Sequence, residues 1–153
     1  YSLAMILSDY AAENSPGIEF HILATDIAAT VLQKAAAGVY AKDQVSRVPP
    51  LYRLRYLDNL YDGQWMVKQK IRKKVLFRRL NLMRLEYPFK KCFQVIFCRN
   101  VMIYFDEPTR NQMTVRFSRY LEPGGYLFIG HSETLDRSSG LYRFVQPAVY
   151  QKV

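Results

Sequence analysis

The segment FQVIFCRNVMIYF, residues 93–105, joins an apolar run to polar side chains that could bind a ligand. Val95-Ile96-Phe97 is typical of a strand buried on both faces of a parallel sheet. Arg99 and Asn100 then interrupt the apolar sequence, and Tyr104 follows four residues later. Open α/β sheets bind ligands at the carboxyl ends of their strands, so this strand end is a candidate binding site. An exposed loop with two polar residues explains the pattern equally well.

Asp26 is a second candidate for binding chemistry. It directly follows a predicted strand, Ile18–Thr25, and precedes a helical stretch that ends at Ala37 and is closed by Gly38. Nucleotide-binding sheets place the acid that holds ribose hydroxyls at such a strand end. A cap on the following helix is the alternative, and the residues alone favour the cap.

The elements that would position these residues follow an α/β pattern. Residues 1–13 have apolar positions at helical spacing, and Asp106-Glu107-Pro108 indicates the start of another helix. Residues 75–82 predict a strand that carries Asn81 at its end. A strand at 126–129 and a terminal hairpin, formed by residues 144–145 and 149–150, complete the pattern.

Residues 42–74 are the least regular part of the chain. Pro49-Pro50 predicts the start of a helix that continues through Leu60, with four leucines along one side: Leu51, Leu54, Leu57 and Leu60. Asp62-Gly63 indicates a turn, and Gln64–Val67 a short strand. Residues 68–74 (KQKIRKK) are basic with a single isoleucine.

Composition sets the class of protein. A chain of 153 residues, half of them hydrophobic, fits one globular domain. No apolar run is long enough to span a bilayer, so we expect no membrane insertion. Cys92 and Cys98 lack metal-ligand spacing, and we interpret them as free thiols of a reducing compartment rather than a disulfide, which predicts the cytoplasm and no metal site.

The net charge of +9 is concentrated in one third of the chain. Residues 42–91 hold 14 Lys and Arg against 4 Asp and Glu, whereas the rest holds 8 against 9. Such a block attracts an acidic partner, either a nucleic acid or an acidic protein surface. A solvated basic face without a specific partner is the alternative.

Five stretches match one known family in their order along the chain: ATDI (24–27), AAAGVY (35–40), Asn81-Leu82, IFCRNVMIYF (96–105) and LEPGGYLFIGHSETL (121–135). They resemble the chemotaxis-receptor glutamate methyltransferases, the CheR family. The resemblance implies a Rossmann-like methyltransferase sheet and methyl transfer from S-adenosylmethionine to glutamates on the cytoplasmic helical bundle of a chemoreceptor, with S-adenosylhomocysteine as product. It also implies a small inserted subdomain around residues 42–74, which in some members docks a receptor tail peptide by strand addition.

The resemblance assigns roles to the candidate residues. Asp26 would hold the cofactor ribose, and Asn81-Leu82 would lie near its adenosine end. Arg99 and Asn100 would border the cofactor, with Arg99 also catalytic. For Arg99, a salt bridge that only shapes the loop is an equal alternative.

Tyr104 would orient the acceptor carboxylate near the methyl group. Packing in the core is the alternative for this tyrosine, since it lies between Ile103 and Phe105. His131, Ser132 and Glu133 match the family's Gly-His-Ser-Glu sequence, to which we assign no chemical role.

Methylation of a carboxylate makes few chemical demands on the enzyme. A glutamate with an ordinary pKa of about 4.3 is already ionised at neutral pH, so no general base is needed. Orientation and exclusion of water remain for the protein. The segment CRNVMIYF fits this requirement, because it contains no His, Asp or Glu that could act as a base.

Two other functions remain as alternatives. Methyltransferases that act on bases or glutamine commonly carry an Asn/Asp-Pro-Pro-aromatic motif at this strand end, where this chain has CRNVMIY. A nucleic-acid methyltransferase is therefore disfavoured, although the basic block would suit one. A catalytically silent module that binds an acidic partner is the second alternative.

The first residues depart from the family pattern. Tyr1-Ser2-Leu3-Ala4 resembles the segment that follows the family's glycine-rich cofactor loop, so that loop and the first strand would precede it. We therefore expect the carboxyl-terminal part of a larger enzyme. In the family the first strand lies between the strands ending at Asp26 and Arg99, so we expect these two not to pair with each other.

Overall fold

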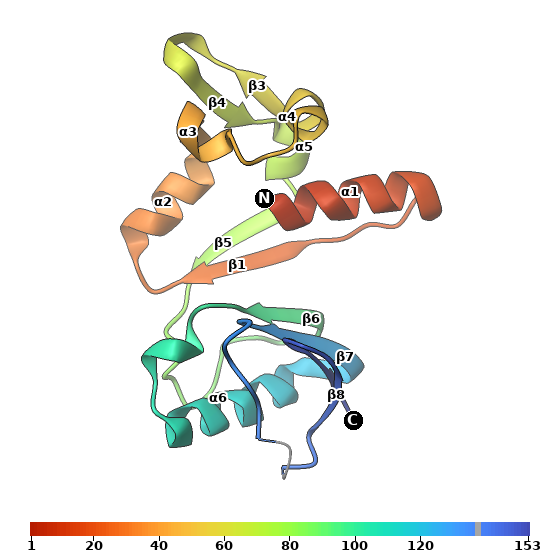
Figure 1. The fold of residues 1–153 in the computed structure, drawn as a ribbon, viewed down its shortest axis with the longest axis vertical. Coiled ribbons are helices and arrows are strands. Elements are labelled where there is room, and N and C mark those ends of the chain that lie inside the picture. Colours follow the sequence, from red (N-terminus) through yellow and green to blue (C-terminus); the bar gives the residue numbers. More distant parts are fainter. Residues whose placement is uncertain (137–138) are drawn as a thin grey trace. The chain divides into compact units, whose positions relative to one another are not determined.

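The computed structural model describes residues 1–136 and 139–153, which form two compact units (Figure 1). Unit 1 comprises Tyr1–Asn81 and unit 2 comprises Leu82–Val153. Each unit contains its own parallel strand pair, helices and core. In the described part of the chain, no helix is both long and apolar enough to cross a membrane.

Unit 1 contains two parallel strands, β1 (Ile22–Asp26) and β5 (Val75–Arg79), paired from Ile22 with Val75 to Asp26 with Arg79 (Figure 1). The predicted strands began four residues too early at Ile18 and ended three residues too late at Leu82. Helix α1 (Ser2–Asn14) precedes the sheet, and α2 (Ala29–Ala37) follows β1. The predicted end of α2 is confirmed: Gly38 has a φ of 67°, a conformation that glycine adopts without steric cost.

A second sheet of unit 1 lies between α2 and β5 in the sequence. Its order is β2-β4-β3, with antiparallel pairing throughout. The predicted strand at 64–67 is confirmed, with the same bounds. The segment consists of β2 (Val39–Ala41), α3 (Lys42–Val45), α4 (Pro50–Tyr56), β3 (Leu57–Asn59), η1 (Tyr61–Gly63), β4 (Gln64–Val67) and α5 (Gln69–Arg72).

The helix predicted through Leu60 is wrong in its last third. Helix α4 ends at Tyr56, and Leu57 adopts an extended conformation, pairs with Val67 and is buried. Leu54 is 76% exposed, so the leucine spacing does not mark a core-facing stripe. Burial of Leu57 within the small sheet outweighs the local helical pattern, because tertiary packing routinely overrides helix propensity.

The core of unit 1 joins this small sheet to α1. Its buried members are Ala4, Met5, Val45, Tyr56, Leu57, Val67 and Ile71. They come from α1, α3, α4, β3, β4 and α5, so the segment between α2 and β5 shares one hydrophobic core with the first helix. The boundaries of an inserted basic subdomain around residues 42–74 remain a prediction.

Unit 2 contains a four-stranded sheet of order β6-β7-β9-β8. Strands β6 (Phe93–Cys98) and β7 (Leu121–Ile129) are parallel, while β8 (Tyr142–Gln146) and β9 (Val149–Lys152) form the predicted terminal hairpin. Between β6 and β7 lie η2 (Met102–Tyr104) and α6 (Glu107–Tyr120). The predicted start of α6 is confirmed, since the Asp106 side chain accepts a hydrogen bond from the Thr109 amide at 3.1 Å.

Strand β6 is not buried on both faces in this chain. Val95 and Phe97, which share one face, are both exposed, and Phe97 stacks on Phe128 of β7 with ring centroids 4.4 Å apart. Cys98, on the opposite face, is buried. The continuous apolar run of the sequence therefore overstated the burial of this strand.

Strands β1 and β6 belong to separate sheets. Within the described residues, β1 pairs only with β5, and β6 pairs only with β7. Because β1 and β6 lie in different units, the expectation that the strands ending at Asp26 and Arg99 do not pair with each other stays a prediction. Each strand keeps one edge whose backbone groups form no ladder within the described chain.

Candidate functional site

The carboxyl edge of the β1–β5 pair brings Asp26 and the segment before Asn81 together. The Asp26 carbonyl accepts a hydrogen bond from the Leu80 amide at 3.0 Å, and Arg79 Nε donates to the Ile27 carbonyl at 2.9 Å. These bonds extend the contact between the two chain segments past the strand ends. Asn81 therefore follows β5 at the same sheet edge as Asp26.

The Asp26 carboxylate is half-buried and oriented by its own backbone. Its Oδ1 accepts a hydrogen bond from the Ala28 amide at 2.8 Å, and no side chain caps α2 itself. This contact is an Asx turn, which holds the carboxylate at the strand end. The helix-cap interpretation is therefore wrong in detail, although the side chain does order the turn that enters α2.

Leu82, the first residue of unit 2, is held through its backbone. Its carbonyl accepts hydrogen bonds from the Tyr87 hydroxyl at 3.0 Å and from Arg116 Nη1 at 3.3 Å. Arg116 is buried, and its Nη1 also donates to the Arg84 carbonyl at 2.5 Å. A buried arginine thus fixes the loop that begins at Leu82, a contact that the sequence pattern did not predict.

Arg99 and Asn100 follow β6 and are both exposed. Asn100 has a φ of 59°, in the left-handed region that asparagine tolerates better than most residues. The backbone therefore turns sharply directly after the strand. The sharp turn and the exposed polar groups fit a ligand site at the end of β6.

Tyr104 is the last residue of η2, and its side chain is 79% exposed. Met102, two residues earlier, is fully buried and anchors the short helix. The packing interpretation of Tyr104 is wrong for this chain, because the ring is not part of the core of unit 2. Its phenol is available to a ligand.

Glu133 is the residue whose importance the sequence analysis missed. It is only 5% exposed, and its two carboxylate oxygens accept backbone hydrogen bonds from Ile103 and Gly130. The Gly-His-Ser-Glu match pointed to this position without giving its role. A glutamate in a short turn after an apolar strand gave no local sign that it would be buried.

Cys98 precedes Arg99 and does not supply a nucleophile. Burial, reinforced by the Glu133 carboxylate, raises the pKa of the Cys98 thiol to about 12. The thiol therefore stays protonated at neutral pH, and only thiolates are good nucleophiles. Within the part of the chain that the structure describes, no group of three or more His, Cys, Asp or Glu could hold a metal ion.

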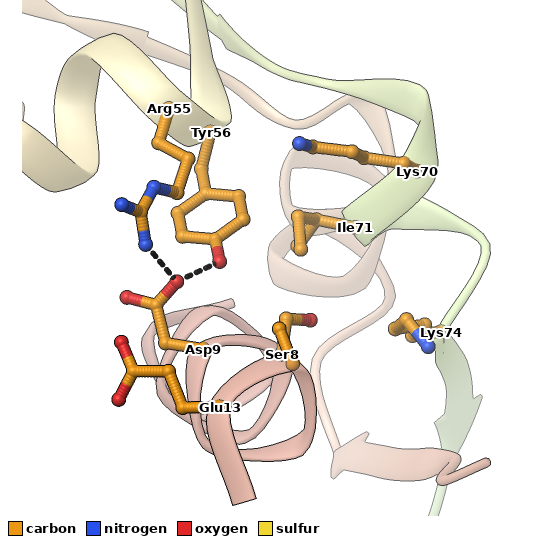
Figure 2. Close-up of a pocket in the computed structure, with 9 residues that line it drawn as sticks. Ser8, Asp9, Glu13, Arg55, Tyr56, Lys70, Ile71 and Lys74 are labelled. Carbon is orange, nitrogen blue, oxygen red and sulfur yellow. Dashed lines mark hydrogen bonds and ion pairs between the residues drawn. The ribbon is translucent and has the colours of Figure 1, made fainter. Parts of the chain in front are cut away.

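A cavity of about 510 Å³ lies in unit 1, between α1 and the helices α4 and α5 (Figure 2). Asp9 of α1 accepts hydrogen bonds from Arg55, at 2.5 Å, and from the Tyr56 hydroxyl. None of the candidate residues lines this cavity. We interpret the cavity as the junction of α1 with α4 and α5, and the candidate site at the strand ends stays a prediction.

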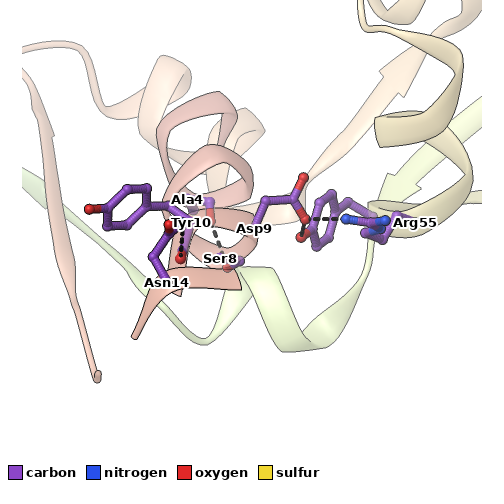
Figure 3. Close-up of polar contacts among 7 residues, drawn as sticks. Ala4, Ser8, Asp9, Tyr10, Asn14 and Arg55 are labelled. Carbon is purple, nitrogen blue, oxygen red and sulfur yellow. Dashed lines mark hydrogen bonds and ion pairs between the residues drawn. The ribbon is translucent and has the colours of Figure 1, made fainter. Parts of the chain in front are cut away.

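Asp9 is the polar centre of that junction. Ser8 and Asn14 of α1 donate hydrogen bonds to backbone carbonyls of the same helix (Figure 3). Asp9, in contrast, accepts a hydrogen bond from Arg55 of α4. The hydrogen bonds from Tyr56 and Arg55 lower the pKa of Asp9, and burial together with Asp9 raises the pKa of Tyr56 to about 12.

The lowered pKa of Asp9 predicts an acid-sensitive junction. A carboxyl whose pKa is lower in the folded state stabilises the fold above its ordinary pKa of 3.8, and this stabilisation is lost as the pH falls below that value. We expect the melting temperature of Asp9→Asn to fall less than that of the unmodified protein between about pH 5 and pH 2. The exposed Asp43→Asn is the control, and equal pH profiles for all three proteins would contradict the prediction.

A family model for the SAM-binding domain of CheR methyltransferases matches residues 1–150. The chain belongs to the CheR methyltransferase family. The domain that this model describes binds S-adenosylmethionine, abbreviated SAM, as its cofactor. The fold is that of a Rossmann-like methyltransferase. The resemblance carried by the segments at 96–105 and 121–135 is confirmed.

Curated chemotaxis methyltransferases are similar to almost the whole chain. The chemotaxis protein methyltransferase of Borreliella burgdorferi is 44% identical, with 99% of this chain and 53% of that protein covered. The Klebsiella aerogenes protein of the same name is 39% identical, with 91% and 48% covered. The chain therefore spans about half the length of the curated relatives it matches.

Among solved structures, the glycopeptide N-methyltransferase MtfA in complex with S-adenosylhomocysteine is similar at a TM-score of 0.45 and 12% identity. That match covers 97% of this chain and 57% of the other. A likeness this distant carries no argument about the site.

The polar groups at the two strand ends fit parts of SAM. The carboxylate of Asp26 is a suitable acceptor for ribose hydroxyls, and its Asx turn keeps it at the strand end. The exposed amide of Asn100 can both donate and accept hydrogen bonds. Each unit of this CheR-family chain thus presents polar groups at the carboxyl end of its first parallel strand.

Proposed function

We propose that the protein transfers a methyl group from SAM to glutamate carboxylates of a chemoreceptor. The observation that carries this proposal is the exposed phenol of Tyr104, five residues after Arg99, in a CheR-family segment that contains no His, Asp or Glu. A carboxylate acceptor is the substrate class that needs no base, because it is already ionised at neutral pH. The names of the relatives support methylation in chemotaxis.

Asp26, Asn81 and Leu82 bind the nucleoside part of the cofactor in this proposal. Asp26 accepts hydrogen bonds from the ribose hydroxyls, and its bond to the Ala28 amide fixes the carboxylate before the ligand arrives. Asn81 and Leu82 contact the adenosine end, with the Leu82 carbonyl held by Arg116 and Tyr87. Preorganisation of this kind lowers the entropy that binding must offset.

Arg99, Asn100 and Tyr104 bind the reacting end in this proposal. SAM supplies the electrophilic methyl group when it is bound. Asn100 and Arg99 border the cofactor at the turn after β6, and the Arg99 guanidinium also attracts the acceptor carboxylate. Tyr104 donates a hydrogen bond to that carboxylate and orients one oxygen toward the methyl group.

The charge distribution supports an acidic protein partner. Within the described part of residues 42–91, only Arg55 and Lys68 lie within ion-pair distance of a carboxylate, although this segment holds 14 basic residues. The remaining positive charge is available to an acidic receptor helix bundle. Both cysteines are free thiols, which supports a cytoplasmic location, where such a bundle would be accessible.

Methyl transfer to receptor fragments tests the proposal. We expect the full-length protein to transfer label from methyl-labelled SAM to a receptor cytoplasmic fragment with glutamates at its acceptor positions. A fragment with glutamines there should stay unlabelled, and mild base should release the label as expected for an ester. Label in the glutamine fragment or in RNA would show instead that the acceptor is a nitrogen or a nucleic acid.

A further inference from the structure

Glu133 is a buried acid that forms no ion pair among the described residues of the chain. It lies in the turn after β7, where its own amide donates to the Gly130 carbonyl at 3.0 Å. Burying a carboxylate is costly unless hydrogen bonds compensate its charge. The hydrogen-bond donors that compensate the charge of Glu133 therefore show which parts of the chain this side chain holds.

The two oxygens bind two different elements. Oε2 accepts a hydrogen bond from the Gly130 amide at 2.5 Å, directly after β7. Oε1 accepts one from the Ile103 amide at 3.0 Å, in the middle of η2. One side chain thus connects the end of β7 to the short helix that follows β6, across 30 residues of sequence.

The space around Gly130 shows that the end of β7 lies close to the turn after β6. A Cβ added to Gly130 would lie 2.8 Å from Oε2 of Glu133 and 3.3 Å from Oδ1 of Asn100. The first distance is far inside van der Waals contact, so a side chain at this position would displace the carboxylate. Gly130, Glu133 and Asn100 therefore meet at one point, between the ends of β6 and β7.

We propose that Glu133 is a positioning residue for methyl transfer: by holding the Ile103 amide, it fixes η2 so that Tyr104 projects at a constant place. This inference rests on the proposed function, because it assigns Glu133 to the same site. Tyr104 is 79% exposed, so packing of its ring does little to fix it. Its position depends on the burial of Met102, on the bond from its own amide to the Val101 carbonyl at 3.2 Å and on the bond that holds Ile103.

The substitution Glu133→Gln tests this role with little change in shape. Glutamine keeps one carbonyl oxygen, but its second group is an amino group, which would face a backbone amide donor. It can therefore keep only one of the two bonds, and we expect it to keep the shorter one, from Gly130 at 2.5 Å, and to lose the one from Ile103 at 3.0 Å. Glu133→Asp keeps both oxygens on a shorter side chain and serves as the partial rescue, while Glu122→Gln removes a carboxylate from β7 of the same unit as the control.

Three measurements on these variants separate positioning from simple stability. We expect hydrogen exchange of the Ile103 amide to become at least about tenfold faster in Glu133→Gln and to be unchanged in Glu122→Gln. In the full-length protein, kcat should fall by about 10- to 100-fold with little change in the KM for SAM, as expected for a displaced orienting group. Glu133→Asp should recover part of both effects.

The decisive measurement is the combination of Glu133→Gln with Tyr104→Phe. If Glu133 acts through Tyr104, the double variant should be no slower than the slower single variant, whereas independent effects would multiply. Multiplicative effects, or unchanged exchange at Ile103, would overturn the proposal. A wild-type protein without methyl transfer would contradict the proposed function, while the exchange of the Ile103 amide would still decide whether Glu133 holds η2.

Discussion

Replacement of Asp26 by alanine is expected to weaken SAM binding by about 10- to 150-fold, because hydrogen bonds to charged groups contribute about 1.5–3 kcal/mol. The structure adds a second, smaller effect, since the Ala28 amide also loses its acceptor. Isothermal titration of the full-length protein with SAM measures the affinity, and thermal unfolding without ligand measures the stability. The affinity should change far more than the melting temperature.

The variant Asp26→Asn separates the two effects. Asparagine keeps an oxygen for the Ala28 amide but loses the negative charge and the second acceptor. We expect it to restore the melting temperature while SAM affinity stays low. Asp62→Asn, on an exposed turn with a φ of 66°, is the matched control. If Asp26→Ala kept full affinity for SAM and lost only thermal stability, the Asp26 carboxylate would order the Asx turn without binding the cofactor.

Replacement of Tyr104 by phenylalanine should slow methyl transfer on the order of 100-fold, since removing one preorganised hydrogen-bond donor has effects of this size. The ring is largely exposed, so loss of the hydroxyl should leave both the melting temperature and SAM affinity unchanged. Single-turnover transfer to the receptor fragment measures the chemical step directly.

Tyr61→Phe provides the control for this substitution. Tyr61 is 96% exposed on η1 and is not one of the candidate residues, so the same hydroxyl is removed from a different short helix. We expect wild-type rates from this variant. A wild-type rate for Tyr104→Phe as well would remove Tyr104 from the mechanism and leave Arg99 as the remaining candidate for orienting the acceptor.

Local patterns predicted the elements whose signals lie within a few residues. The strand Gln64–Val67 follows a turn that Asp62-Gly63 marks, and both have positive φ angles. Helix α6 starts where Asp106 caps it, and α2 ends at Gly38 in the left-handed conformation. Turns and caps depend on neighbouring backbone groups, so the sequence contains the whole signal.

The same locality explains why the candidate residues could be chosen from the sequence. Asp26, Arg99 and Asn100 each come directly after an apolar run, and strand ends are where such sheets bind ligands. The family resemblance added Tyr104, Asn81 and Leu82, which physical reasoning alone would have left among ordinary core and loop residues. The roles of all six residues in catalysis and binding remain predictions.

Tertiary structure decided the features that depend on partners distant in sequence. Leu57 joins a strand rather than a helix because Val67 pairs with it, and Tyr104 is exposed because Met102 fills the core position of η2. Glu133 is buried because the amides of Ile103 and Gly130 satisfy both of its oxygens. The family and several of the larger elements could be predicted from the sequence, because motifs, caps and turns depend on neighbouring residues. Which residues become buried was settled by long-range contacts, because the free energy of burial depends on whatever the fold brings alongside.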